Sequence, residues 1–242
     1  MEVHHHPEVE KKGLKEYLLE GFMIFLAVSM GFIAENIREN ITEHKTEKIL
    51  AESVLEDMKK DTASLNSLIV ANNKRLNSIN ALLVMLHLPK EQWNDTNCYR
   101  NMAPIMTSVP FNPTDGTYTQ MKTSGTLRYF KQSLVNLMNE YDVQTRKTAY
   151  RDNVVQNAIW VLGDLIFDSI NLEVLADMRF NKPIIHEMYL NLKDKAKIDK
   201  FINLIVMNQT HRIRASQEYE EQLKIATKLI NNLQAAYHFK NE

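Results

Sequence analysis

The apolar residues of this chain recur mainly at the spacing of α-helices. From 37 to 86 they follow one another at intervals of three, four or sums of these, a pattern typical of an amphipathic helix or a coiled-coil seam. Neither Pro nor Gly occurs in 32–88, so one long helix is predicted there. The apolar row consists of Ile37, Ile41, Ile49, Met58, Leu65, Leu68, Leu76, Ile79, Leu83 and Leu86.

The second half of the chain predicts further helices. One apolar stripe at helical spacing runs from Leu127 to Tyr141, and another from Val154 to Ile166. A last helix is expected over about 194–238. Core packing explains each of these stripes, because apolar residues three and four positions apart share one helix face.

Two breaks separate the predicted helices. Four of the six prolines fall in 89–113, which predicts a connection rather than a helix. This connection is longer than ordinary bundle loops, so we interpret it either as a functional flap or as a crossover at the tip of the bundle. A second break is expected at 168–183, followed by a short helix that begins near Ile184.

An uncharged apolar run lies near the amino terminus. Residues 21–34 read GFMIFLAVSMGFIA and cover roughly 21 Å as a helix, less than the ~30 Å hydrocarbon core of a bilayer. Extended to 14–37, the segment is long enough to span, and its terminal charged side chains can reach the headgroups. A buried helix of a soluble protein is the alternative. A cleavable signal is disfavoured, because the small-x-small match at 27–29 lies inside the run and is followed by more apolar residues.

These patterns predict an all-α fold, in which an amino-terminal transmembrane helix continues into a long helix that packs in an antiparallel helical bundle. The expected segments are a His-rich tail at 1–13, a transmembrane anchor at 14–37 and a helical-bundle domain at 38–242, with the Pro-rich connection at 89–113.

One face of the predicted membrane helix carries small residues. At 100° per residue, Glu20, Ile24, Ala27, Gly31 and Ala34 share that face. Ala27 and Gly31 form a small-xxx-small pair, which lets neighbouring helix backbones approach closely. We therefore predict a membrane-helix contact face for self-association, although small residues are also common in membrane helices that form no such contact. Glu20 could line an assembly or contact headgroup water, and the second role is favoured.

The amino-terminal sequence resembles a known family. Residues 4–39, HHHPEVEKKGLKEYLLEGFMIFLAVSMGFIAENIRE, resemble the opening of a family of single-span membrane proteins of Bacteroidota that is defined only as a domain of unknown function. Residues 117–131, TYTQMKTSGTLRYFK, are similar to a short Tyr-x-x-Met/Leu-Lys-x-Ser-Gly-x-Leu-Arg signature of such proteins. The resemblance implies location and architecture, and it brings no catalytic residue. It also makes a purification tag an unsatisfactory explanation of His4, His5 and His6, whose imidazoles could bind Ni, Cu or Zn.

Membrane orientation is weakly encoded. Residues 1–20 and 35–54 contain three basic residues each, so the positive-inside rule does not decide between the two orientations. A short tail before an uncleaved anchor and a large domain favours a cytoplasmic tail. We therefore expect a single span in the bacterial inner membrane, with the bundle in the periplasm.

Charge and motif content limit the chemistry. With 29 Lys and Arg against 30 Asp and Glu, the chain has no net field that would attract nucleic acid, and no nucleic-acid partner is expected. His186 and Glu187 begin an HExxH motif, but Leu190 stands where the second His belongs. The single cysteine, Cys98, is interpreted as incidental rather than nucleophilic. We expect no enzyme activity, no cofactor and no metal site.

A row of carboxylates is interpreted as a solvated helix face, with divalent-cation binding as the alternative. The row consists of Glu35, Glu39, Glu43 and Glu47.

The expected function is that of a membrane-anchored helical-bundle protein, serving as an assembly, scaffold or sensing module of the cell envelope. Its expected partners are the membrane and either further copies of itself or another envelope protein. Two alternatives stay open: an accessory subunit of an oligomeric ion- or solute-conducting membrane complex that uses Glu20, and a membrane-tethered enzyme with an unrecognised site.

Overall fold

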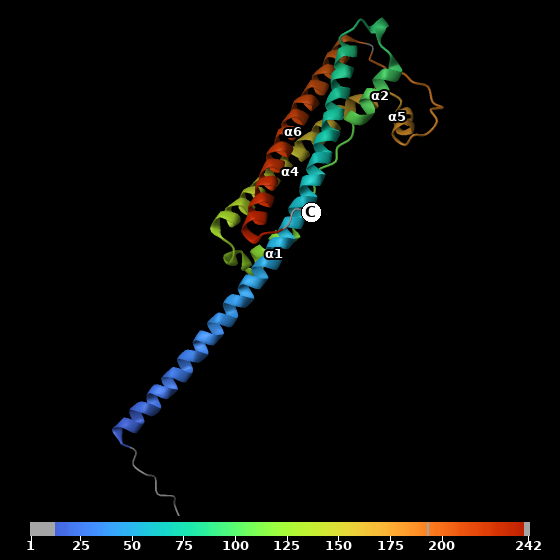
Figure 1. Cartoon of the computed structure of the whole chain (residues 1–242). Helices are drawn as coiled ribbons and strands as arrows, with labels where there is room; N and C mark the ends of the chain where they lie inside the picture. Colours follow the sequence, from blue (N-terminus) through green and yellow to red (C-terminus); the bar gives the residue numbers. More distant parts are fainter. Residues whose placement is uncertain (1–12, 193, 240–242) are drawn as a thin grey trace, which may run out of the picture. The chain divides into compact units, whose positions relative to one another are not determined.

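The computed structural model describes residues 13–192 and 194–239. Within these residues the chain contains no β-strand, and the all-α prediction is confirmed. Short 3-10 helices lie at Lys90–Gln92 and Thr126–Tyr129. The α-helices are α1 (Leu14–Leu86), α2 (Asp95–Ile105), α3 (Gly116–Ser124), α4 (Gln132–Phe167), α5 (Leu172–Arg179) and α6 (Lys195–Tyr237) (Figure 1).

The chain divides into two compact units, residues 1–49 and residues 50–242. The described part of the first unit consists of Gly13 and the beginning of α1. The His-rich residues His4–His6 lie outside the described residues. The second unit contains the rest of α1 and all the other helices, and it forms a helical bundle.

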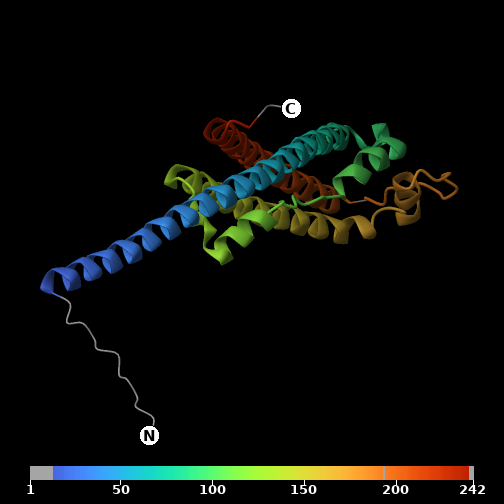
Figure 2. The same ribbon diagram turned by 60° about the horizontal axis from the view of Figure 1, so that its bottom comes forward.

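Three apolar clusters run along the bundle, and α1, α4 and α6 contribute to each. The cluster at one end takes residues from 51–58, 134–141 and 225–233, and the cluster at the other end from 79–86, 162–166 and 201–205. Hence α1 and α4 run in the same direction, and α6 runs antiparallel to both (Figure 2).

The parallel course of α1 and α4 requires the chain to return along the bundle between them. Residues 106–115, which are irregular, make this return from α2 to α3. Phe111 is 5% exposed and belongs to the middle cluster, with Leu65 of α1 and Val155 of α4. The segment is therefore a crossover that runs along the bundle and inserts Phe111 into the core, rather than a flap or a loop at the tip of the bundle.

The expectation that 89–113 holds no helix is wrong, because α2 lies inside it. Asn94 caps α2 by accepting a hydrogen bond from the N–H of Asn97 at 2.8 Å. Burial on one face of the helix then outweighs the nearby prolines, since Tyr99 and Met102 are fully buried. Pro104 lies in the last turn, and the helix ends one residue later at Ile105.

The second predicted break also contains a helix, α5. Asn171 accepts the N–H of Glu173 at 3.0 Å and so caps the start. At the other end Asn181 adopts a left-handed conformation with φ of 52°, and the N–H of Lys182 bonds to the oxygen of Asp177 at 2.9 Å, as in a Schellman motif. The short helix expected after 183 is absent, because 183–192 contain no helical residue.

Candidate functional site

The predicted anchor is exposed within this chain. An 18-residue window of α1 near the amino terminus has a mean hydropathy of 1.9, and none of it is buried among the described residues. Leu14 is 80% exposed and Phe32 is 73% exposed. A core helix of this chain would be mostly buried, so the soluble-helix interpretation is not supported. The helix is long and apolar enough to cross a membrane.

The five residues of the predicted contact face, Glu20, Ile24, Ala27, Gly31 and Ala34, all lie in α1 and are exposed within the chain. A Cβ atom added at Gly31 would have no neighbouring group within 4 Å. Packing inside this chain therefore does not explain why residue 31 is small. Contact of this face with another helix stays a prediction.

A buried carboxylate of α1 holds the crossover. Asp61 is 1% exposed. It accepts the N–H of Thr114 at 2.8 Å and the hydroxyl of Tyr141 at 2.6 Å. Burial and hydrogen bonding to Asp61 raise the pKa of Tyr141. The carboxylate thus joins α1, α4 and the crossover, and its oxygens are satisfied although they are shielded from water.

A second buried carboxylate repeats this arrangement from α4. Asp152 accepts the N–H of Phe111 at 2.8 Å and the hydroxyl of Tyr219 in α6. Burial raises the pKa of Asp152, although both hydrogen bonds act in the opposite direction. Burial, followed by the bond to Asp152, also raises the pKa of Tyr219. The crossover is thereby fixed to two helices by its own main-chain N–H groups.

A buried guanidinium holds the start of the crossover. Arg212 of α6 is 1% exposed. Its Nη2 donates to the main-chain oxygens of Ile105 and Thr107 at 2.8 and 2.9 Å, and its Nε donates to Oδ1 of Asn208 at 2.7 Å. Burial lowers the pKa of Arg212 to about 10. These oxygens partly compensate for the water that the charged side chain has lost.

Sequence reasoning missed this buried polar set, although a signal was present. In α6, Asn208, Arg212 and Gln222 continue the three- and four-residue spacing of the core residues Ile205 and Leu229. Asp61 and Asn72 occupy corresponding positions in α1. A polar residue within an apolar stripe predicts a buried polar contact, but its partner lies far away in the sequence.

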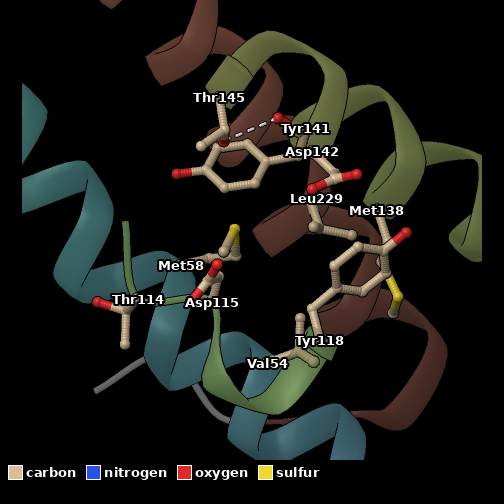
Figure 3. A pocket seen from close by; sticks show the side chains of 10 residues that line it. All are labelled: Val54, Met58, Thr114, Asp115, Tyr118, Met138, Tyr141, Asp142, Thr145 and Leu229. Carbon is tan, nitrogen blue, oxygen red and sulfur yellow. Dashed lines mark hydrogen bonds between the residues drawn. The ribbon is translucent and has the colours of Figure 1, made fainter. Parts of the chain in front are cut away.

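The cavity beside Tyr141 is small. Figure 3 shows Met58, Thr114 and Tyr118 around it, together with Tyr141 and Leu229. Its volume is about 30 Å³, far below the ~300–1,000 Å³ of typical ligand pockets. This cavity has no room for a metabolite or an organic cofactor.

Cys98 and His186 are the remaining candidates for a chemical role. Cys98 is fully buried, and burial raises the pKa of its thiol to about 12, so it is a poor nucleophile. Nδ1 of His186 lies 3.0 Å from Asp177, and its Nε2 lies 3.6 Å from Glu173. In the part of the chain that the structure describes, no group of three or more His, Cys, Asp or Glu side chains is placed to hold a metal ion.

Comparison with protein-family models, curated proteins and solved structures yields no match for this chain.

Proposed function

We propose that this protein is a membrane-anchored helical bundle. Residues 14–37 cross the bacterial inner membrane once, and the bundle acts in the periplasm as an assembly, scaffold or sensing module. The observation that carries the proposal is the exposure of the apolar side chains at the start of α1, such as Phe32 at 73%. Apolar surface of this extent is unfavourable in water and is stabilised in a bilayer. The proposed resemblance of residues 4–39 to single-span membrane proteins of Bacteroidota predicts the same arrangement.

Self-association through the face of Ala27 and Gly31 is part of this proposal. Close helix approach in lipid depends on small residues, because lipid chains are as apolar as the helix surface itself. Packing within the chain places no limit on the size of residue 31, so contact between chains is the role we propose for this glycine.

Membrane fractionation tests the proposal. Cells that express the chain with an epitope after Glu242 are converted to spheroplasts, treated with protease, and extracted with carbonate. We expect the protein to pellet and the epitope to be digested from outside. A pelleted protein with a protected epitope would reverse the orientation, and release into the soluble fraction would refute the span.

A further inference from the structure

Two hollows adjoin at the end of the bundle that contains α2 and α5. One has a volume of about 640 Å³ and is lined by Arg100, Arg179 and Lys182. The other has a volume of about 340 Å³ and is lined by Trp160 and Phe167 of α4. Both hollows include Thr107 and Arg179 in their walls, so they are neighbours, and we call the two together the α2–α5 groove.

The basic part of the groove has no acidic counterpart in the described chain. Arg100, Arg179 and Lys182 form no ion pair with a described residue, and no acidic residue lines this hollow. The acidic side chains of α5, Glu173 and Asp177, lie beside His186 instead. All three cationic side chains are exposed, so a dissolved anion can reach them and is attracted by their charge.

The aromatic part of the groove is open to a ligand. Trp160 is 60% exposed and Phe167 is 46% exposed. Large aromatic side chains that stay exposed beside a hollow provide a flat apolar surface, and stacking on it adds to the free energy of binding. Arg179 lines both hollows, so the cationic and aromatic walls lie next to each other.

Part-buried hydrogen bonds hold the backbone around the groove in place. The hydroxyl of Tyr99 in α2 donates to the oxygen of Tyr189 at 2.9 Å and accepts the N–H of Asn171 at 2.7 Å. This single side chain therefore connects α2 to the start of α5 and to the segment that follows α5. Nε of Arg75 in α1 donates to Oγ1 of Thr107 at 3.3 Å, at the junction of the two hollows. A groove that is already formed loses little conformational entropy when it binds a ligand.

We propose that the α2–α5 groove binds a soluble amphipathic anion, with a carboxylate or phosphate group between Arg100, Arg179 and Lys182 and an aromatic or other apolar body against Trp160. The planar forks of the two arginines suit the paired oxygens of such groups. This inference rests on the proposed sensing role of the bundle and names the class of ligand that it would detect.

Calorimetric titration of the full chain in phosphatidylcholine nanodiscs tests the inference. The probes are phenyl phosphate and 3-phenylpropionate. The control probes are inorganic phosphate, which lacks the aromatic body, and phenol, which lacks the anionic group. We expect saturable binding of both amphipathic anions, about tenfold tighter than inorganic phosphate, which corresponds to about 1.4 kcal/mol. Binding should weaken as salt concentration rises. Absence of saturable binding of both amphipathic probes up to ~10 mM would overturn the proposal.

Matched variants separate the two halves of the groove. Arg179→Gln should weaken phenyl phosphate binding by about tenfold or more, since a charge-assisted hydrogen bond is lost. Trp160→Ala should weaken phenyl phosphate binding while leaving inorganic phosphate binding unchanged. The control is Arg214→Gln, which removes an exposed arginine of α6 outside the groove. An equal loss in Arg179→Gln and Arg214→Gln would show a nonspecific charge effect and refute the site. Fractionation tests the membrane anchor separately, so a failure of either proposal can be told from a failure of the other.

Discussion

Nη2 of Arg212 donates to the main-chain oxygen of Ile105 at 2.8 Å, so a side chain of α6 caps the carboxyl end of α2. A cation is favourable at that position, because the helix macrodipole and the unpaired last carbonyl groups are negative there. The same guanidinium then binds Thr107. It therefore stabilises both the end of α2 and the first residues of the crossover.

Arg212→Met should destabilise the bundle by about 3 kcal/mol, because one buried and one part-buried carbonyl oxygen lose their donor. Urea unfolding followed by tryptophan fluorescence measures this, since Trp93 and Trp160, the two tryptophans of the chain, both belong to the bundle. The matched control, Arg214→Met, changes an exposed side chain of the same helix and should cost less than about 0.5 kcal/mol. Equal midpoints for the two variants would contradict the capping role of Arg212.

Asp152→Asn should lower stability at neutral pH by about 1–3 kcal/mol, since the amide nitrogen replaces one carboxylate oxygen and cannot accept the hydrogen bond that this oxygen accepted. The pH dependence has a definite sign. Burial raises the folded-state pKa of Asp152 above its usual value of 3.8, so the folded protein binds this proton before the unfolded chain does. The stabilising contribution of protonation is complete below about 3.8 and is lost as pH rises through the raised pKa.

Wild type should therefore gain stability relative to Asp152→Asn as pH falls towards 4. Urea midpoints of the two proteins between pH 7 and pH 4 give this difference, in which the titration of shared groups largely cancels. A difference that stays constant or shrinks over this range would contradict the assigned direction of the pKa change.

Cys98 should resist alkylation in the folded protein. Its thiol is fully buried, and a pKa of about 12 leaves on the order of one thiolate in ten thousand at pH 8. Iodoacetamide labelling followed by mass spectrometry should find little modification under native conditions and full modification in urea. Rapid native labelling would mean that α2 opens readily from the bundle.

Gly31→Leu should abolish self-association of the anchor, because a large side chain keeps the two helix backbones apart. Neither Gly31 nor Gly21 has a neighbouring group within 4 Å of an added Cβ, so neither substitution should disturb the fold. Gly21→Leu is the matched control, since residue 21 lies off the predicted contact face. Crosslinking in native membranes measures the outcome. Oligomers that persist in the Gly31→Leu variant would rule out this face.

The long helices could be predicted because their apolar residues repeat over many turns. The last helix, expected over about 194–238, is observed as Lys195–Tyr237. The short helices α2 and α5 escaped prediction because each depends on an Asn cap and on tertiary burial rather than on a long stripe, as Asn94 and Asn171 illustrate. A repeat of apolar residues within one segment is visible in a sequence. An Asn cap near prolines cannot be told from the Asn residues that are common in loops.

The hydrogen-bonded core and the groove depend on contacts between distant segments. Asp152 is separated by 41 residues from Phe111 and by 67 from Tyr219, so neither partner can be identified from local spacing. Likewise, Arg100 and Arg179 line one hollow only because α2 and α5 pack together. The helical pattern predicts which face of a helix carries these polar and charged residues. Their contact partners are decided by which helices pack together in the folded protein.

The position of α6 in the chain has a consequence for biosynthesis. All three apolar clusters contain residues of α6, which follows every other helix. The ribosome therefore releases the apolar row of α1 long before its partners exist, and at about 5–20 residues per second this interval is on the order of ten seconds. A chain interrupted before α6 would retain the proposed anchor and lose one wall of every cluster, so it would reach the membrane without a folded bundle.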